Sequence, residues 1–193
     1  MNVAAPTASS VLDASRSCLV LIDFQPRLVG ALVHSESVLK NARRLASAAR
    51  LLNVPAYATE QNPEKLGPSD PELASLIDEI FKKMCFSATG TELNDQLRAR
   101  QAAGHANGGQ QLVIAGCEAH ICLLQTALQL QDDGGSVFVV SDACSSRTEK
   151  NWLAAMDRLG RAGCEIVTTE MVLFEWLSTA EHPHFRAVQA LIK

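Results

Sequence analysis

The chain is poor in the features that mark membrane and nucleic-acid-binding proteins. No apolar run approaches the roughly 20 residues of a membrane-spanning helix, so we expect no membrane partner. Aromatic residues make up 5% of the chain, no Lys/Arg-rich run occurs, and the formal net charge is −4. Proteins that bind nucleic acid by neutralising phosphates have the opposite charge balance. The composition therefore predicts no nucleic-acid partner.

Paired cysteine motifs are also absent. The chain has six cysteines, and none of their spacings is the C-x-x-C of redox and zinc sites. A chain of 193 residues needs no disulfide to be stable, and we find no secretory signal pattern. We therefore expect free thiols in a reducing, cytoplasmic environment. Cys18, Cys85 and Cys164 stand in apolar stretches, and we interpret them as small buried hydrophobic residues.

Residues 1–16 contain few features that favour ordered structure. The segment is rich in Ala and Ser and holds one acidic and one basic residue. We predict a flexible tail here, followed by a single domain over 17–193. Because the segment is Ser-rich and acid-poor, it also resembles a weak organelle-targeting sequence, and a mitochondrial location is the alternative to a cytoplasmic one.

What the chain has instead is a regular alternation of short apolar runs and amphipathic stretches. The apolar runs predict buried strands, and apolar residues at three- and four-residue spacing predict helices. This alternation implies a mostly parallel, doubly wound α/β sheet of about six strands with both faces covered. The predicted strands are 18–24, 55–60, 83–88, 111–117, 136–142 and 164–170. The predicted helices are 38–52, 72–81, 91–102, 119–131 and 150–163, with a turn or loop at 104–109 and two short helices at the end.

The segment 111–127, QLVIAGCEAHICLLQTA, predicts a strand, a tight turn and a helix with a thiol in its first turns. Unpaired N–H groups and the helix dipole at such a place favour a thiolate and can bind an oxyanion. Cys122 is therefore a candidate nucleophile. Cys117, at the tip of the strand, is the alternative.

Charged residues stand beside two other predicted strands. Ligands of parallel sheets bind beyond the carboxyl ends of the strands, and Asp23 ends the first strand, where a carboxylate is unfavourable unless paired or functional. Lys83 lies beside another apolar run, and the sequence does not separate it from Lys82. A carboxylate here could take the proton of a thiol while an ammonium holds the charges together. The structural alternatives are a helix cap or a structural ion pair for Asp23, an exposed position for either lysine, and core packing for Cys122.

Three segments together resemble a known family. LVLIDFQ, KMCFS and GCEAHICLLQTALQL are similar to the signature segments of the isochorismatase-like cysteine hydrolase superfamily. TEQNPEKLGPSDPEL (59–73), SDACSSR (141–147) and HPHFRAVQALIK (182–193) resemble its isochorismatase domain-containing branch. The resemblance covers nearly the whole chain from about Cys18 on. It implies a three-layer α/β/α sandwich.

The resemblance also implies a catalytic triad. Matched motif by motif, the triad is Asp23 as base, Lys83 as electrostatic partner and Cys122 as nucleophile. Lys82 has no match to the motif. Cys117 falls where related hydrolases have an aliphatic residue, so the resemblance assigns the chemistry to Cys122.

The resemblance further implies an unusual turn after the fourth predicted strand. It suggests a non-proline cis peptide between Cys117 and Glu118. Such a bond would direct the N–H of Glu118, together with that of Cys122, into an oxyanion hole. Backbone donors of this kind contribute roughly 3–4 kcal/mol each in known cases.

Two departures from the family narrow the expected chemistry. The nicotinamidase branch binds a metal through an Asp and several His after the second strand, and the segment here, TEQNPEKLGPSDPE, has no His. The five histidines of the chain show no ligand spacing. We therefore expect no catalytic metal and no cofactor, and nicotinamide becomes a less favoured substrate. Isochorismatase proper replaces the Cys, so cleavage of isochorismate is not expected either.

The motif SDACSSR follows the fifth predicted strand. Asp142, Ser146 and Arg147 could line a pocket or a subunit contact, but a turn with Asp142 or Ser145 capping the next helix is the structural alternative. STAE (178–181) fits a capping box. The candidate pocket residues are Phe24, Glu60, Gln61 and Arg147.

Taken together, the sequence predicts a cysteine hydrolase acting on a small amide- or imide-like C–N bond through an acyl-thioester. We expect a small-molecule substrate and a homo-oligomer, for which the apolar C-terminal helices could serve. One alternative is a slow or inactive scaffold or regulatory protein with the same fold, and another is a nucleic-acid-processing protein. Selective reactivity of Cys122 would distinguish the hydrolase from the scaffold or regulatory protein. A salt-sensitive RNA-binding assay tests for the nucleic-acid-processing protein.

Overall fold

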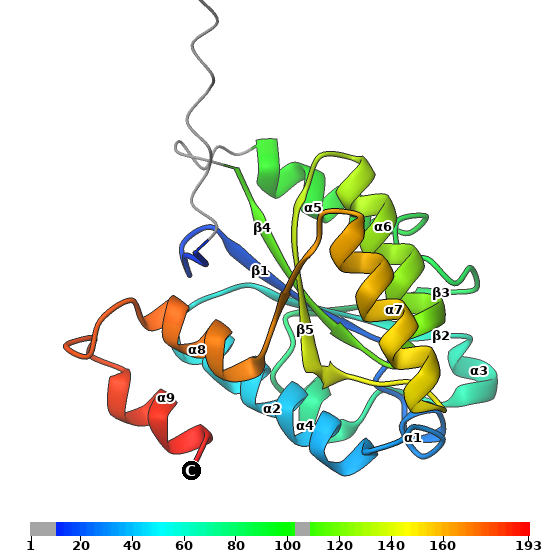
Figure 1. The fold of residues 1–193 in the computed structure, drawn as a ribbon, viewed down its shortest axis with the longest axis horizontal. Coiled ribbons are helices and arrows are strands. Elements are labelled where there is room, and N and C mark those ends of the chain that lie inside the picture. Colours follow the sequence, from blue (N-terminus) through cyan, green and yellow to red (C-terminus); the bar gives the residue numbers. More distant parts are fainter. Residues whose placement is uncertain (1–10, 103–108) are drawn as a thin grey trace, which may run out of the picture.

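The computed structural model describes residues 11–102 and 109–193 (Figure 1). The turn predicted at 104–109 lies outside the described residues except at its last position. Six parallel strands form one sheet in the order β3-β2-β1-β4-β5-β6, which confirms the predicted doubly wound sheet. The strands are β1 (Ser17–Ile22), β2 (Ala56–Gln61), β3 (Glu79–Lys83), β4 (Gln111–Gly116), β5 (Ser136–Cys144) and β6 (Glu165–Val167).

Helices cover both faces of the sheet (Figure 1). On one face, α2 (Ser35–Leu51) packs against β1, β2 and β5, with α8 (Thr169–Leu177) and α9 (Phe185–Leu191) beside it. On the other face, α6 (Leu124–Asp132) packs against β5, and α7 (Glu149–Arg161) packs against β6. This is the expected three-layer sandwich. The remaining elements described are α1 (Pro26–Val29), α3 (Pro63–Leu66), α4 (Pro71–Ala74), α5 (Glu92–Ala102) and the π-helical turn η1 (Ala119–Leu123).

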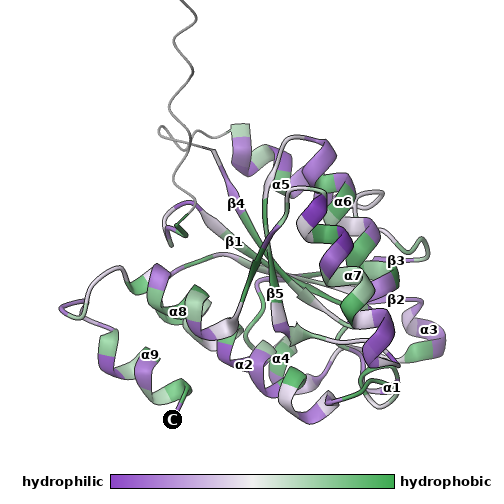
Figure 2. Ribbon diagram, viewed as in Figure 1, coloured by the Kyte–Doolittle hydropathy of each residue, from purple (hydrophilic) through white to green (hydrophobic). Residues whose placement is uncertain are grey.

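Burial follows the hydropathy of the chain. Every residue of the central strands β1 and β4 is buried, as expected for parallel strands covered on both faces. Figure 2 shows hydrophobic colour along the central strands and mixed colour around the helices. In the described part of the chain, no helix has the length and apolar character needed to cross a membrane.

The strand order reverses between β1 and β4, and a switch point of this kind opens a crevice beyond the carboxyl ends of the strands. Gly116, which ends β4, pairs with Ile22 of β1. A Cβ added to Gly116 would stand 2.6 Å from the Cβ of Ile22, so the close approach of the two strand ends requires a glycine. The residues that follow, Asp23 and Cys117, therefore leave the sheet next to each other.

The chain between residues 72 and 88 differs from the prediction. Of the helix predicted over 72–81, the structure forms only α4, and β3 already begins at Glu79, which pairs with Tyr57 of β2. Of the strand predicted over 83–88, only Lys83 lies in β3, and residues 84–88 belong to the loop after it. The prediction from the apolar spacing was wrong here because pairing with a neighbouring strand overrides the local pattern.

Three smaller expectations are also corrected. Leu12, within the predicted tail, is 2% exposed, and its N–H donates to Glu175 Oε2 at 2.7 Å. Residues 11–16 are therefore anchored to the domain. Cys85 is exposed, because it lies in the loop after β3. Ser178 ends α8 with a left-handed conformation (φ 57°) and does not begin a capping box.

Candidate active site

Two residues beyond the central strands have left-handed backbone conformations. Asp23 directly follows β1 and has φ 58°, and Glu118 lies two positions after β4 and has φ 50°. This conformation costs an L-residue roughly 1–2 kcal/mol, and strained residues cluster at functional sites. The switch point of the sheet therefore carries backbone strain on both sides.

Asp23 and Lys83 form a fully buried ion pair. Lys83 Nζ lies 2.7 Å from Asp23 Oδ2, and both side chains are inaccessible to solvent. Thr59 Oγ1 donates to Asp23 Oδ1 at 2.7 Å, and Lys83 Nζ donates to Gln61 Oε1 at 2.7 Å. Both charged groups thus have further hydrogen-bond partners, which a buried ion pair requires because it has lost its water.

The alternation of side chains along β3 distinguishes Lys82 from Lys83. Successive residues of a strand point to opposite faces, and in β3 Lys82 is exposed whereas Lys83 is buried. Lys83 Nζ also donates to the carbonyl oxygen of Phe86 at 3.0 Å. Lys83 is therefore the lysine that the structure brings to Asp23.

Cys122 lies in η1, the π-helical turn that leads from β4 into α6. The charges of Asp23 and Lys83 both act on its thiol, and the residue is 5% exposed. Thr126 Oγ1 donates to the Cys122 carbonyl oxygen at 2.7 Å and so ties the turn to α6. The structure thus brings Asp23, Lys83 and Cys122 together at the switch point.

The surroundings hold the Cys122 thiol in its protonated form. Burial is the largest cause and the negative charge of Asp23 the next, and together they raise the pKa of Cys122 to about 12. The positive charge of Lys83 lowers this pKa and offsets part of the rise. At pH 7 only about one thiol in 10⁵ is then ionised. The thiolate stabilisation expected from the helix start is outweighed by burial and by the carboxylate. A nucleophile in this state must pass its proton to a base as it attacks.

Cys117 has a different environment. It is 0% exposed, and its N–H donates to the Ile22 carbonyl oxygen at 2.9 Å. Burial, with a further contribution from the charge of Asp23, raises the pKa of Cys117 well above its ordinary value. Cys117 therefore packs as a small hydrophobic residue behind the turn.

The peptide bond between Cys117 and Glu118 is not cis, contrary to expectation. The described residues contain no cis peptide bond, and the chain turns instead through the left-handed conformation of Glu118. The N–H of Ala119 donates to the Ser145 carbonyl oxygen at 2.8 Å, which fixes this turn against the loop after β5. The N–H groups of Glu118 and Cys122 stay the candidates for an oxyanion hole.

The side chain of Glu118 is buried and bonded to Arg147, a residue expected in the pocket. Glu118 is 3% exposed, and its Oε1 accepts from Arg147 Nε at 2.9 Å and also from Arg147 Nη2. The hydrogen bond to Glu118 raises the pKa of Arg147. Glu118 Oε2 has no hydrogen-bond partner in the described part of the chain and lies 3.5 Å from His120 Nδ1.

The other candidate pocket residues differ in their distance from the ion pair. Gln61 contacts it directly, through the bond from Lys83 Nζ. Phe24 is 2% exposed and belongs to the hydrophobic core. Glu60 is 6% exposed, and its Oε1 accepts from the N–H of Ser69 at 2.7 Å. Phe24 and Glu60 thus have structural roles in the loops beside the site.

The motif SDACSSR supplies contacts rather than a helix cap. The cap of α7 is Thr148, and neither Asp142 nor Ser145 takes that place. Asp142 Oδ1 accepts from both the N–H and the hydroxyl of Thr169, at 2.7 and 2.9 Å, at the start of α8. The motif therefore connects the end of β5 to the start of α8.

Sequence reasoning missed three polar residues around the site. Thr59 binds Asp23, and Gln25, which is 0% exposed, donates from Nε2 to the Gln61 carbonyl oxygen at 3.0 Å. The two-residue spacing of Thr59 and Gln61 could have shown that they share a face of β2. His120, the third, has Nδ1 2.9 Å from the Ser146 hydroxyl, and nothing in the sequence indicates this contact.

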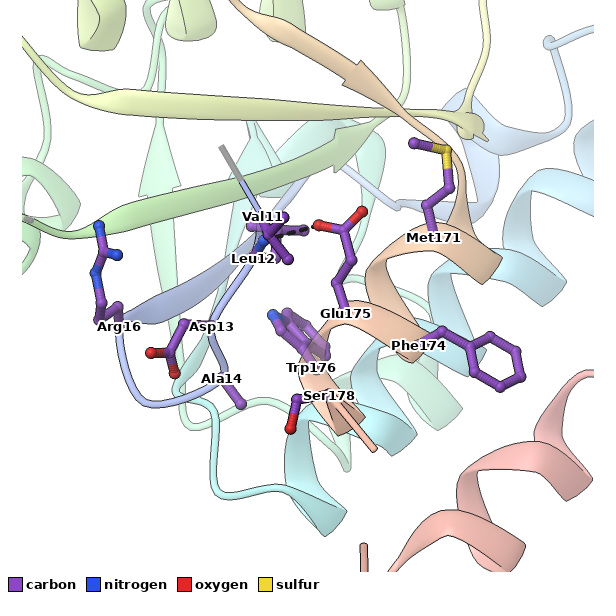
Figure 3. A pocket seen from close by; sticks show the side chains of 10 residues that line it. All are labelled: Val11, Leu12, Asp13, Ala14, Arg16, Met171, Phe174, Glu175, Trp176 and Ser178. Carbon is purple, nitrogen blue, oxygen red and sulfur yellow. Dashed lines mark hydrogen bonds between the residues drawn. The ribbon is translucent and has the colours of Figure 1, made fainter. Parts of the chain in front are cut away.

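The surface has two hollows whose lining does not include Cys122. One, of about 870 Å³, borders β3 and the loop after it. The other, of about 700 Å³, lies between residues 11–16 and α8, and Figure 3 shows Val11, Met171 and Phe174 among the side chains around it. Within 11–102 and 109–193, no group of three or more His, Cys, Asp or Glu could hold a metal ion.

The fold and the site define a doubly wound α/β protein with a buried Asp–Lys pair and a thiol at the switch point. The Isochorismatase domain family matches residues 17–171. Over its whole length the chain is 37% identical to isochorismatase domain-containing protein 2 of Bos taurus, and the match covers 90% of that protein. The chain belongs to the isochorismatase family, and its domain is of the isochorismatase hydrolase type. The family expected from the sequence motifs is thus confirmed.

Solved structures have the same architecture. The MAR1 ribonuclease from Caenorhabditis elegans has a TM-score of 0.86 and 31% identity, covering 94% of this chain and 92% of that one. The YcaC gene product of Escherichia coli, an octameric hydrolase of unknown specificity, has a TM-score of 0.79 and 25% identity, with 94% of each chain covered. YcaC from Pseudomonas aeruginosa, solved with hexane-2,5-diol and covalent acrylamide, has the same TM-score and identity, covering 94% and 95%.

Proposed function

We propose that this protein is a cysteine hydrolase of a small amide or imide, with Cys122 as nucleophile and Asp23 as base. One observation carries the proposal: a fully buried Asp23–Lys83 pair lies at the switch point beside the turn that holds Cys122, and both charges act on its thiol. A protonated thiol beside an ionised carboxylate is the arrangement that general-base activation needs. Lys83 holds the carboxylate in place.

The first half of the reaction forms an acyl-thioester. Cys122 passes its proton to Asp23 while its sulfur bonds to the carbonyl carbon, and the carbonyl electron pair moves onto oxygen. The N–H groups of Glu118 and Cys122 are proposed to bind this oxyanion. When the C=O bond re-forms, the C–N bond breaks, and the leaving nitrogen takes the proton from Asp23.

The second half releases the acid. Water attacks the thioester carbon and gives a proton to Asp23, and the electron pair again moves onto the carbonyl oxygen. When this intermediate collapses, the C–S bond breaks and the sulfur takes the proton back, which regenerates the thiol. In the proposed chemistry Asp23 carries the proton in both halves.

The test is a panel of small amides and imides assayed with wild type and Cys122→Ala. We expect turnover of at least one compound by wild type and its loss in the variant, with an acyl adduct on Cys122 seen by mass spectrometry. Lys82→Met is the matched control, because this lysine is exposed next to the buried Lys83. Equal turnover by wild type and Cys122→Ala would overturn the proposal.

A ribonuclease activity is the second candidate, because one similar solved structure is named a ribonuclease. The net charge of −4 weakens it, since phosphate binding favours basic surfaces. Incubation with RNA at low and at high salt separates the two functions. Salt-sensitive cleavage that persists in Cys122→Ala would favour the ribonuclease.

We further propose that the protein forms a homo-oligomer. The YcaC gene product of E. coli is an octameric hydrolase. In this chain Val11, Met171 and Phe174 are 57%, 45% and 39% exposed around one hollow (Figure 3). Clustered exposed apolar side chains are typical of protein contacts. We call this set the α8 patch.

A further inference from the structure

The side chain of Glu118 joins the loops that follow β4 and β5. Its Oε1 accepts two N–H groups of Arg147. One position further along, the N–H of Ala119 donates to the Ser145 carbonyl oxygen. A side-chain bond and a backbone bond thus connect the same two loops on either side of the strained Glu118 backbone.

This carboxylate has only half of its hydrogen-bonding capacity satisfied. Glu118 is 3% exposed, and its Oε2 is buried with no hydrogen-bond partner in the described part of the chain. A buried, partly satisfied charge is unfavourable for folding. Such an exception calls for a reason other than stability.

His120 closes the second side of the carboxylate. Its Nδ1 lies 2.9 Å from the Ser146 hydroxyl and 3.5 Å from Glu118 Oε2, and its Nε2 lies 3.3 Å from Asn151 Nδ2. Both neighbours of the ring come from the loop after β5 and from α7. The Glu118 side chain is thereby confined between Arg147 and His120.

We propose that Glu118 is a positioning residue, whose carboxylate, held by Arg147, fixes the direction of its own N–H toward the oxyanion. The inference rests on the proposed function, since it needs an oxyanion at this turn. The carboxylate does not touch the substrate in this account, because Oε2 is inaccessible. It acts through the backbone, by keeping Glu118 at φ 50° against the relaxation that an unrestrained residue would undergo.

Two alkylating reagents separate this role from activation of the thiol. With acrylamide, Cys122 gives its proton to Asp23, the sulfur bonds to the β-carbon, and the C=C pair moves onto the carbonyl oxygen as an enolate. The α-carbon then takes the proton from Asp23. With iodoacetamide, Cys122 again gives its proton to Asp23, the S–C bond forms as the C–I bond breaks, and iodide leaves with that electron pair. The first reaction develops an oxyanion, and the second does not.

The variants are Glu118→Gln, Arg147→Ala and the double variant. Asp157→Asn is the matched control, because it removes the carboxylate from an exposed ion pair with Arg161. The rate of Cys122 modification by each reagent is measured by peptide mass spectrometry. Thermal unfolding of each variant checks that it is folded, and Arg147→Lys, which keeps the charge without the planar fork, is the milder variant.

We expect Glu118→Gln and Arg147→Ala to slow the acrylamide reaction about tenfold or more, while the iodoacetamide rate changes less than about twofold. The double variant should be no slower than the slower single one, because both act through one contact. Arg147→Lys should recover part of the acrylamide rate. Asp157→Asn should match wild type with both reagents.

Other outcomes are equally decisive. Equal slowing with both reagents would assign Glu118 to thiol access or folding, and an unchanged acrylamide rate would remove its role. Either result overturns the inference and leaves Cys122 as nucleophile. Failure of wild-type Cys122 to react faster than the other cysteines with either reagent would overturn the proposed function, and the inference with it.

Discussion

Lys83 Nζ and Asp23 Oδ2 lie 2.7 Å apart in a region without solvent, although the two residues are 60 positions apart in the chain. One stands at the end of an edge strand and the other at the end of a central strand. Removing one partner of such a pair leaves an uncompensated buried charge, which is far more destabilising than losing the pair as a whole.

Lys83→Met is therefore expected to lower the free energy of unfolding by about 3–5 kcal/mol. Asp23→Asn combined with Lys83→Met should restore part of that loss, because no charge is then left buried alone. Urea unfolding measures both. The control is Lys82→Met at the neighbouring exposed position. A single Lys83→Met change as mild as the control would show that the pair is solvated in solution.

Alkaline pH should destabilise the fold through its buried thiols. Burial raises the pKa of Cys18 from 9.0 to about 12. The stabilisation is thus complete below pH 9 and is lost as pH rises toward 12, because the unfolded chain ionises first. Above pH 9 each such thiol lowers the free energy of unfolding by about 1.4 kcal/mol per pH unit.

The measurement is urea unfolding between pH 8 and pH 10.5, roughly the range bracketing the ordinary thiol pKa. Cys18→Ala should reduce the slope of the free energy of unfolding against pH by the contribution of one thiol. This reduction is independent of how the substitution changes the absolute stability. Val20→Ala is the control, since Val20 is equally buried in β1 and does not titrate. Identical slopes in all three proteins would contradict the role of Cys18.

Gly116→Ala should disturb both the fold and the site. Its Cβ would lie 2.6 Å from the Ile22 Cβ and 2.9 Å from the Ile22 carbonyl oxygen, so the ends of β4 and β1 must separate. Overpacking of this kind costs about 1–3 kcal/mol, and Asp23 should shift relative to Cys122. We expect a lower Tm together with slower iodoacetamide labelling of Cys122. The control is Gly134→Ala, where an added Cβ meets nothing within 4 Å but φ is +84°. It should lower Tm without changing the labelling rate.

Phe174→Glu tests the α8 patch. A carboxylate in an apolar contact between copies would be desolvated, so assembly should weaken by about tenfold or more in dissociation constant. Light scattering after size exclusion measures the mass. Leu153→Glu is the control, because Leu153 is 55% exposed on α7, on the other face of the sheet. An unchanged mass in Phe174→Glu, with a smaller mass in Leu153→Glu, would move the contact to α7.

Periodicity predicted most of the fold because its signals are local. The continuous apolar run at β4 and the helical spacing in α2 each lie within one element, and alternation of such elements implies a parallel sheet. Prediction failed between 72 and 88, where the apolar spacing is helical but β3 pairs with β2. Pairing between distant segments is invisible to a local pattern.

The residues of the candidate site also include some that the sequence indicated and others that it did not. The family motifs led to Asp23, Lys83 and Cys122, although the strand that carries Lys83 was predicted in the wrong place. Thr59 and His120 were missed, since their contacts depend on the distance between loops. The prediction that Cys85 is buried was wrong for the same reason. The position of β3 decides which side of the following loop faces solvent, and Cys85 is exposed.

By itself the sequence determined the order of strands and helices and the family, because hydropathy and motif spacing are properties of contiguous residues. Only the tertiary structure decided that the Cys122 thiol is protonated. Burial and the charge of Asp23 raise its pKa to about 12. It also replaced the expected cis peptide by a left-handed Glu118 held by Arg147. Burial and ion pairing depend on distances across the fold, and these exist only once the strand ends have come together.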